Sequence, residues 1–313
     1  MKFSQPDPGA IPRSSRFRGT RPRTGLNLIE LVVIITVIGV TLMLLLPVIQ
    51  HTRETARRMQ CYNNLKELAL ACGEHQDTLH HFPTGGWPGP DYWAGDPDLG
   101  YEKRQPGGWT YNILPFLDNK ALHDGGTRQT SAQKKAIFSA RAQTPLEVYY
   151  CPSRRLPMVY PIPQSIRWNP YNMNPVSFAA RTDYAANGIL ENGMGIIYAN
   201  SLTTIKDIRD GLSHTYLLGE KNLAADRYKE GTSLGDSLPV YGNAFWDWER
   251  SGNTPPARDR RGMDNYTAFG SAHPIGFNVS FCDSSACTIS YDIDPIMHLR
   301  LCDRRDGKVA VLP

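Results

Sequence analysis

Residues 24–49 read TGLNLIELVVIITVIGVTLMLLLPVI, and this stretch decides how the N-terminal part of the 313-residue chain folds. No charged residue occurs from Leu31 to Ile49, a run of 19 residues (49 − 31 + 1). That length is close to the roughly 20 apolar residues needed to cross a hydrocarbon core about 30 Å thick. One acid, Glu30, stands at the start of the run, although an unpaired carboxylate in lipid is costly. The stretch therefore predicts a membrane-spanning helix in which Glu30 has a specific role.

The basic charge of the chain is concentrated before this stretch. The first 25 residues contain six basic residues and one acid, Asp7, so this leader carries +5 (6 − 1). The whole chain carries +4, which leaves about −1 (4 − 5) for everything after the leader. Because cytoplasmic flanks carry the excess of Lys and Arg, we expect a cytoplasmic N-terminus and a body outside the cytoplasmic (inner) membrane. The body has no long basic run, so we expect no nucleic-acid partner.

Three interpretations of the N-terminus are open. A secretory signal peptide also has a basic region, but this apolar run exceeds the usual length of about 7–15 residues and no small-x-small cleavage site follows it. A plain membrane anchor would leave Glu30 at the interfacial end of the helix. A prepilin-type signal would be cleaved after Gly25, on the cytoplasmic side of the apolar run.

Residues 23–30 resemble the processing motif of type IV prepilins, in which a basic leader ends in Gly and the fifth mature residue is Glu. Here the leader would end at Gly25, and Glu30 is mature residue 5 (30 − 25). Pro47 is mature residue 22 (47 − 25), where pilin-like helices commonly carry a Pro, and we expect it to bend the helix. The resemblance implies cleavage by a prepilin peptidase and methylation of Leu26.

The same resemblance gives Glu30 a purpose. It implies that this carboxylate meets the N-terminal amine of a neighbouring subunit, and an opposite charge offsets the cost of burying either group. A carboxylate in the first turn also meets the positive end of the helix dipole. The Gly–Glu spacing and Pro47 together favour the prepilin interpretation over the plain anchor.

The helical pattern continues beyond the apolar run. Spacings of four, three and four residues place one set of apolar side chains on a single face: Cys61, Leu65, Leu68 and Cys72. We expect a helix over about residues 26–77, within a segment 26–80 that is first transmembrane and then amphipathic. Cys61 and Cys72 would lie about 16 Å apart along its axis, so they cannot bridge each other.

Blocks along the rest of the chain resemble a group of bacterial pilin-like proteins of unknown function, the DUF1559 domain. The matching blocks are residues 57–66, 81–83, 107–109, 113–117, 151–153, 183–188, 210–211 and 219–221. The group's C-terminal signature is His, nine residues, then Asp-Gly. His273 and Asp283 have this spacing (283 − 273 = 10), but Ser284 stands where the Gly is expected. The resemblance implies a DUF1559-like extracytoplasmic domain over residues 81–313.

Residues 82–109 form a long stretch rich in Gly, Pro and aromatic residues. Loops of this length are usually functional or mobile. The favoured interpretation is a surface loop whose aromatic side chains pack onto the domain, since Trp is highly buried on average. The alternative is a patch for a glycan or a protein partner.

Short strands are expected at residues 148–150, 195–198, 215–218 and 278–281, with short helices at 133–142 and 205–207. Residues 277–291 read as a hairpin around Asp283. Cys282 and Cys287 flank its turn and could face each other, so we predict a disulfide between them. All six cysteines belong to the part placed outside the cytoplasm, where disulfides form, but the sequence does not choose among the other pairings.

Catalytic constellations are not evident. The chain has no P-loop, nucleophile elbow or HExxH motif, and we expect neither an enzyme nor a cofactor. His75, His80 and His81 are expected to be exposed loop residues and not a metal site. His273 and Asp283 form the best polar pair, and the favoured interpretation is that His273 caps a turn while Asp283 shapes the hairpin loop. A metal role for this pair is the weaker hypothesis.

Together these observations predict an α+β, pilin-like fold in which a long N-terminal helix packs on an antiparallel, loop-rich sheet domain. The expected function is that of a pilin-like or pseudopilin-like structural subunit in the inner membrane. Its expected partners are a prepilin peptidase, a type IV pilus or type II secretion machine, copies of itself or related subunits, and membrane lipid. The alternative is a membrane-tethered binding module that never polymerises.

Overall fold

The computed structural model describes residues 27–87, 92–163, 169–188, 195–243, 247–308 and 310. The described chain forms two compact units that divide within one long helix, and residues from Thr52 onward belong to the second unit. Gly25 and Leu26, the residues of the predicted cleavage site, lie outside the described residues.

The long helix, α1 (Leu28–Leu79), confirms the predicted helix and extends it by two residues beyond Asp77. Pro47 lies inside α1 and does not end it. From Leu28 to Ile49 the side chains are exposed, and the first buried residue of the helix is Cys61. Within the described residues, α1 is the one helix that is long and apolar enough to cross a membrane.

Five strands form the main sheet of the described residues, in the order β5-β3-β4-β8-β9. Their bounds are β3 (Tyr184–Asn187), β4 (Tyr216–Glu220), β5 (Glu249–Arg250), β8 (Phe277–Phe281) and β9 (Ala286–Ile289). All neighbours are antiparallel except β3 and β5, which are parallel. Two small two-stranded pairs complete the β structure: β1 (Tyr160–Pro161) with β2 (Phe178–Ala179), and β6 (Ala257–Arg258) with β7 (Gly270–Ser271).

The remaining helices are short. They are α2 (Trp109–Asn112), α3 (Lys120–Asp124), α4 (Ser131–Ala142) and α5 (Pro295–Cys302), with 3-10 turns η1 (Pro97–Leu99), η2 (Leu114–Leu117), η3 (Glu147–Tyr149), η4 (Ile205–Asp207) and η5 (Leu212–His214). The predicted helices at 133–142 and 205–207 correspond to α4 and η4. Thr130 and Gln133 form a reciprocal capping box that explains where α4 begins.

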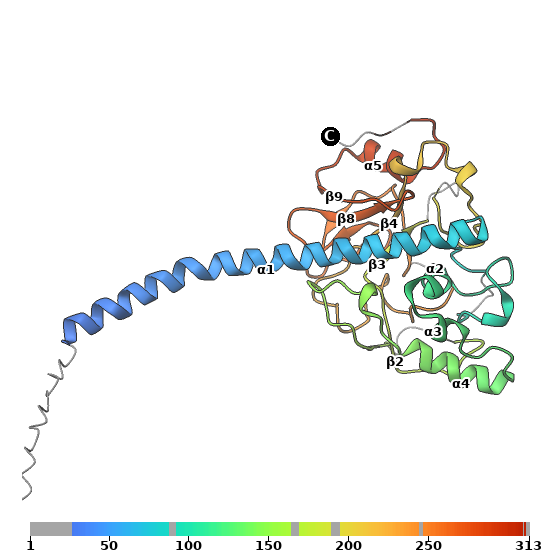
Figure 1. The fold of residues 1–313 in the computed structure, drawn as a ribbon, viewed down its shortest axis with the longest axis horizontal. Coiled ribbons are helices and arrows are strands. Elements are labelled where there is room, and N and C mark those ends of the chain that lie inside the picture. The colour runs from blue at the N-terminus through green and yellow to red at the C-terminus, as the bar shows by residue number, and fades with distance from the viewer. Residues whose placement is uncertain are drawn as a thin grey trace, which may run out of the picture. The chain divides into compact units, whose positions relative to one another are not determined.

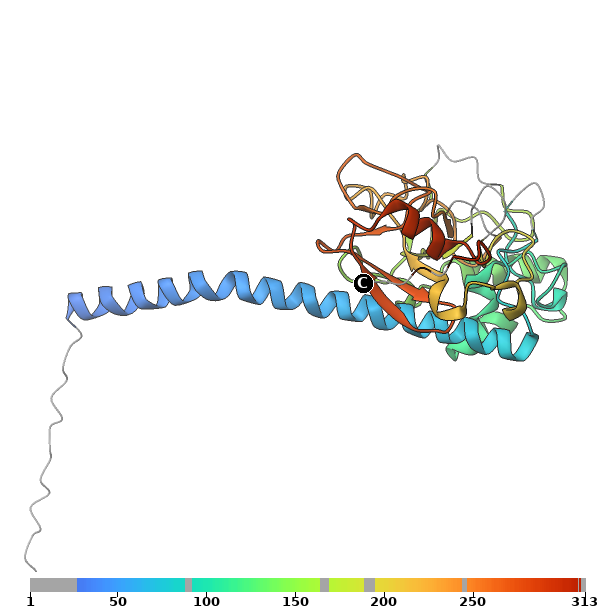
Figure 2. The same ribbon diagram turned by 90° about the horizontal axis from the view of Figure 1, so that it is seen from above.

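Two apolar clusters hold the second unit together. One contains side chains of α1, among them Leu65 and Leu68, packed with residues of β3 and β4. The other joins Leu301 of α5 to aromatic and aliphatic side chains of β8 and β9. In Figures 1 and 2, strands β4, β8 and β9 lie between the second half of α1 and α5. The predicted α+β fold, with its long helix packed on a loop-rich sheet domain, is confirmed.

Two of the predicted strands are wrong. Residues 148–150 fall in and after η3, where the backbone N–H groups of Tyr149 and Tyr150 donate within the turn and not to a neighbouring strand. Residues 195–198 form a bend, in which the N–H groups of Ile196 and Ile197 both donate to the carbonyl of Asn187. Short aromatic and β-branched runs therefore overstate strand content here. The strands predicted at 215–218 and 278–281 correspond to β4 and β8.

Aromatic side chains of the described part of the 82–109 stretch pack on the domain, as predicted. Tyr92 and Trp109 are buried, and Trp93 stacks on Tyr171 with ring centroids 4.0 Å apart. The predicted exposure of the nearby histidines is wrong for His75 and His81, which are buried at the end of α1, whereas His80 is exposed. Burial lowers the pKa of His75 to about 3, and its Nδ1 contacts the carbonyl of His81 at 3.0 Å.

Candidate functional site

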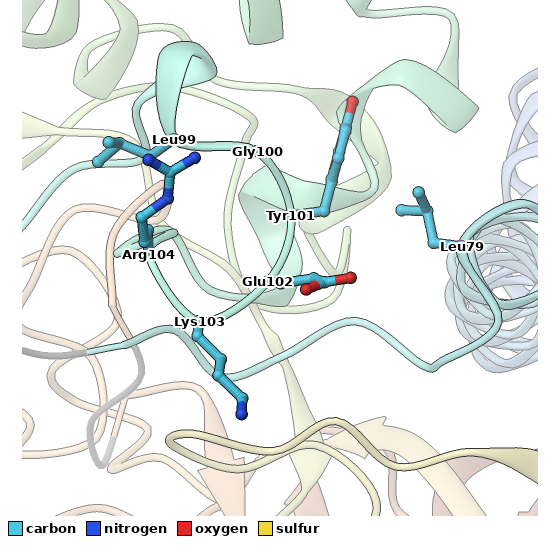
Figure 3. Close-up of a pocket in the computed structure, with 7 residues that line it drawn as sticks. All are labelled: Leu79, Leu99, Gly100, Tyr101, Glu102, Lys103 and Arg104. Carbon is cyan, nitrogen blue, oxygen red and sulfur yellow. The ribbon is translucent and has the colours of Figure 1, made fainter.

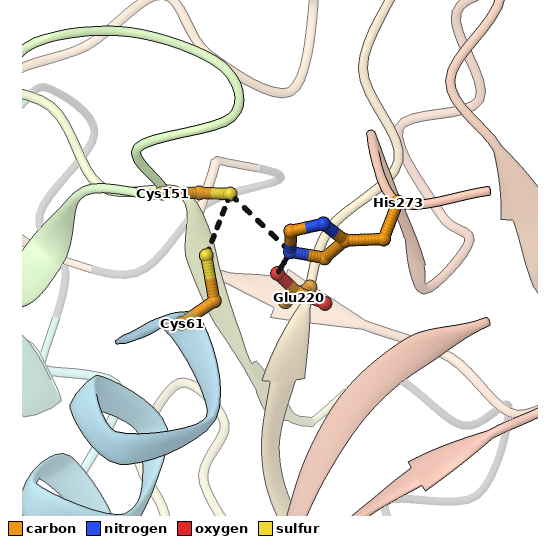
Figure 4. A group of neighbouring side chains, drawn as sticks. All are labelled: Cys61, Cys151, Glu220 and His273. Atoms are coloured by element: carbon orange, nitrogen blue, oxygen red, sulfur yellow. Dashed lines mark hydrogen bonds and ion pairs between the residues drawn. The ribbon is translucent and has the colours of Figure 1, made fainter. Parts of the chain in front are cut away.

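Four buried side chains from distant parts of the second unit meet at one point. They are Cys61 on α1, Cys151 just after η3, Glu220 at the end of β4 and His273 just after β7. One ligand-type atom from each side chain lies within 4.8 Å of the others. Figure 4 shows the two sulfur atoms and the imidazole ring of His273 turned toward one another. We call this group the Cys–His cluster.

The distances within the Cys–His cluster define three contacts. The Sγ atoms of Cys61 and Cys151 lie 2.8 Å apart, and the Sγ of Cys151 lies 3.7 Å from the Nε2 of His273. The same Nε2 lies 3.3 Å from the Oε1 of Glu220. All four residues are fully buried, so their polar atoms depend on nearby protein groups for partners.

His273 is held between two carboxylates. Its Nδ1 contacts the Oε1 of Glu54 at 2.6 Å, while its Nε2 faces Glu220. Burial alone would lower the pKa of His273, but the contacts with Cys151 and Glu220 raise it to about 11. Conversely, burial alone would raise the pKa of Glu220, and the contacts with His273 hold it below its ordinary value. The imidazole is therefore a cation at neutral pH.

Cys151 is positioned by the turn that follows it in the sequence. Its carbonyl accepts from the N–H groups of Arg154 and Arg155, and its own N–H donates to the Oδ2 of Asp183 at 2.8 Å. Asp183 also forms a buried ion pair with Arg155 at 2.7 Å. Ser153 in the same turn donates to Glu54 at 3.0 Å, which ties the turn to α1.

These contacts give the two thiols different acidities. Burial alone would raise the pKa of the Cys151 thiol, but its contacts with Cys61 and His273 lower it below its ordinary value. For Cys61, burial and the neighbouring Cys151 both raise the pKa. The proton of the pair is therefore held by Cys61, and Cys151 has the thiolate character needed for exchange reactions. The donor set as a whole could bind a divalent cation or form a sulfur–sulfur bond.

The structure corrects the predicted partner of His273. Asp283 is exposed in the β8–β9 turn, where its Oδ1 accepts from the N–H and hydroxyl of Ser285. It thus shapes the hairpin loop, as predicted, but it does not meet His273. The imidazole of His273 is in the Cys–His cluster and does not cap a turn. The signature is a fixed number of positions between His273 and Asp283 along the chain, and the two side chains have separate roles in the fold.

All six cysteines are free thiols in the structure, so the predicted disulfide between Cys282 and Cys287 is not formed, and the fold also keeps these two residues apart. The hairpin itself is confirmed, but Cys287 pairs with Val279 across it and Cys282 lies in the turn. Cys282 packs in the cluster that contains α1, whereas Cys287 packs against the cluster that contains α5. The two side chains therefore point to different parts of the core.

Glu30 lies in the first turn of α1, and its Oε2 accepts from the N–H of Asn27 at 3.1 Å. The contact satisfies one of the free N–H groups at the start of the helix. The hydroxyls of Thr36 and Thr41 donate to the carbonyls of Val32 and Val37, each at 2.7 Å. The apolar part of α1 thus meets the hydrogen-bonding needs of these two hydroxyls within itself, as a helix in lipid must.

A separate open cavity of about 360 Å³ lies beside the end of α1. Its lining residues are Leu79, Leu99, Gly100, Tyr101, Glu102, Lys103 and Arg104, shown in Figure 3. Charges of both signs line it, and it coincides with part of the 82–109 stretch. This cavity therefore fits the alternative interpretation of residues 82–109 as a patch for a glycan or a protein partner.

These features define an α+β protein with an N-terminal helix that is long and apolar enough to span a membrane. The chain belongs to the family described as "Protein of unknown function (DUF1559)", whose model matches residues 50–296. The predicted resemblance to the DUF1559 group is thereby confirmed, while residues 23–30 and the apolar run before residue 50 lie outside the match. No curated protein and no solved structure matches the chain.

Sequence reasoning missed the Cys–His cluster, although its signal was present. Each of its four residues lies in a different block of the resemblance to the DUF1559 group: residues 57–66, 151–153, 219–221 and the His of the C-terminal signature. Those blocks are up to 212 positions apart (273 − 61). Spacing along the chain carries no information about their proximity in the fold. The blocks could therefore be recognised in the sequence, but the contact between their side chains could not be predicted.

Proposed function

We propose that the protein is a pilin-like, membrane-anchored structural subunit that a prepilin peptidase cleaves after Gly25. The observation that supports this most directly is the first half of α1. Its large apolar side chains are exposed from Leu28 to Ile49, and the helix carries a single acid, Glu30, in this half. A soluble domain gains nothing from such an exposed surface, whereas a lipid bilayer or the helices of other subunits would cover it.

In this proposal the chain sits in the inner membrane with its N-terminus in the cytoplasm and its body outside. Cleavage after Gly25 removes the basic leader and makes Leu26 the N-terminal residue, which is then methylated. Assembly into a type IV pilus or a type II secretion pseudopilus would proceed through α1, with copies of the chain or related subunits as neighbours. The amine of one subunit would meet Glu30 of the next, which offsets the cost of both charges in an apolar setting.

Mass spectrometry of the N-terminus tests the processing step on protein isolated from its native membranes. A mature chain that begins at Leu26 and carries one added methyl group is expected. A chain that still begins at Met1 would contradict the proposal and leave α1 as a simple anchor.

Substitution Glu30→Ala tests assembly. Loss of the carboxylate should greatly reduce recovery of the protein in sheared or cross-linked assemblies, while the amount in the membrane stays the same. Glu74→Ala is the matched control, because Glu74 is an exposed acid on the other half of the same helix. Equal assembly of both variants would refute a role for Glu30.

A tethered binding module that never polymerises is the second candidate, and the cavity at residues 99–104 favours it. Its ligand would be an envelope glycan or a surface protein, bound by the Tyr101, Lys103 and Arg104 side chains. Under this alternative, Glu30→Ala would leave function intact, whereas Tyr101→Ala would reduce binding of the protein to isolated cell envelopes.

A further inference from the structure

The six cysteines of the chain all lie in the described residues, and one pair stands out. The Sγ atoms of Cys61 and Cys151 are 2.8 Å apart. Cys72, on the same helix as Cys61, is buried in the apolar core, and Cys282 and Cys287 belong to different clusters. The fold therefore selects one pairing that the sequence left open.

The spacing of the sulfur atoms distinguishes the two chemistries that the Cys–His cluster offers. Two thiolates bound to one tetrahedral zinc ion at about 2.3 Å each would lie roughly 3.8 Å apart. The observed 2.8 Å is shorter than that and is closer to a bonded pair of sulfur atoms, which are about 2.05 Å apart. Glu220 and His273 meanwhile form an ion pair at 3.3 Å, although the Oε1 of Glu220 accepts no hydrogen bond, so the sulfur spacing is the observation that favours a sulfur–sulfur bond over a metal ion.

We propose that Cys61 and Cys151 form a disulfide that ties α1 to the globular domain. The inference rests on the proposed function in one respect, because it requires the body to lie outside the cytoplasm, where disulfides form and persist. Cys61 is the first buried residue of α1. The bond would therefore fasten the helix where its buried face begins, beyond the half that carries the exposed apolar side chains.

Bond formation requires an oxidant, and a thiol–disulfide oxidoreductase in its disulfide form is the class that fits. One of the two cysteines, Cys151 for example, loses its proton and attacks one sulfur of the oxidant, forming a mixed disulfide and releasing the first thiolate of the oxidant. Cys61, after losing its proton, attacks the Sγ of Cys151 and releases the second. The two cysteines lose two electrons and two protons, and the oxidant leaves as a dithiol.

Burial fixes when this exchange takes place. Both cysteines are fully buried in the folded domain, so an oxidant reaches them before α1 has packed on the sheet. After packing, the Cys61–Cys151 bond is shielded from dissolved reductants. We expect that a reductant breaks it slowly in the native protein and quickly in denaturant.

Counting of thiols in the full-length chain tests the proposal. Protein extracted from native membranes in detergent is unfolded and alkylated without reduction, and its intact mass is measured. We expect four modified cysteines before reduction and six after it, out of the six in the sequence. A tryptic digest without reduction should contain residues 59–66 linked to residues 142–154.

Single variants make the assignment specific. Cys61→Ser should expose five thiols both before and after reduction, because Cys151 loses its partner. Cys72→Ser is the matched control, since Cys72 is a buried thiol of the same helix. It should expose three thiols before reduction and five after.

Six modified cysteines in the wild-type chain without reduction would overturn the proposal. If those samples also hold about one zinc ion per chain that a chelator removes, the Cys–His cluster is a metal site instead. The N-terminal mass spectrum keeps this failure separate from failure of the proposed function. A chain that begins at Leu26 with six free thiols refutes only the disulfide, whereas a chain that begins at Met1 with four free thiols refutes only the processing.

Discussion

At the scale of single residues, the imidazole of His273 lies between two carboxylates. His273 contacts Glu54 through Nδ1 and Glu220 through Nε2. Glu220 is fully buried, and its other oxygen accepts from the N–H of Asn278 at 2.7 Å. The side chain of Glu54 is 30% exposed, so water can solvate it if His273 is lost. Glu220 is not reached by water, so its charge depends on His273 for compensation.

Substitution His273→Gln should therefore destabilise the protein by about 3–5 kcal/mol, the usual cost of leaving one partner of a buried ion pair alone. The double variant His273→Gln/Glu220→Gln should recover part of that loss, because it removes the stranded charge. Denaturant unfolding in detergent of the wild type, the two single variants His273→Gln and Glu220→Gln, and the double variant gives the coupling energy of the pair. A coupling energy near zero would show that the pair is not the source of the stability.

The same pair predicts a pH dependence. With Cys151 reduced, contacts with Cys151 and Glu220 raise the folded-state pKa of His273 to about 11, above the unfolded value of about 6.5, and the contact with Glu220 still raises it when Cys151 is in a disulfide. The unfolded chain therefore releases its proton first as the pH rises. The contribution of His273 is complete below about pH 6.5 and is lost between pH 6.5 and 11. His273→Gln should flatten the fall in unfolding free energy across this window, and an unchanged slope would contradict the assignment.

At the scale of elements, the β8–β9 hairpin shows how the fold accommodates the missing Gly of the family signature. Ser284 has a φ of 64°, in the left-handed region that Gly adopts at least cost. Its hydroxyl donates to the carbonyl of Ala69 on α1 at 3.1 Å. The serine thus accepts an unfavourable backbone conformation and gains a hydrogen bond between the hairpin and the helix.

Two substitutions separate these effects. Ser284→Ala keeps the backbone conformation and removes the hydrogen bond, so it should destabilise the protein by about 1 kcal/mol. Ser284→Gly removes the bond but relieves the backbone, so it should change the stability by less than about 0.5 kcal/mol. Thermal unfolding of both variants measures the difference. Glycine less stable than alanine at this position would rule out the backbone argument.

At the scale of the whole molecule, the proposed Cys61–Cys151 disulfide closes a loop whose ends are 90 positions apart. A cross-link over such a loop is worth about 4–5 kcal/mol when its effect is mainly on the entropy of the unfolded chain. Cys61→Ala/Cys151→Ala should lose about this much stability relative to wild type under oxidising conditions. With reductant in the denaturant the gap should nearly close, and Cys72→Ala should show no such dependence on reductant.

Much of the architecture could be predicted because its signals are local. The uncharged run from Leu31 to Ile49 and the apolar spacing from Cys61 to Cys72 predicted α1 almost to its last residue. The turn residues around Asp283 predicted the β8–β9 hairpin. Local signals failed where a short apolar run, such as residues 195–198, bends and forms no regular ladder with a neighbouring strand, since pairing depends on distant residues.

The sequence by itself determined the long apolar helix, its single acid Glu30, the charge of the leader, the family and the α+β class, because each depends on order and composition along the chain. Only the tertiary structure decided which cysteine lies beside which and that His273 meets Glu54, Cys151 and Glu220 instead of Asp283. It also decided that Cys282 and Cys287 face apart. The physical reason is that these contacts join α1, the turn after η3, β4 and the segment after β7, and their proximity arises only when the helix packs on the sheet.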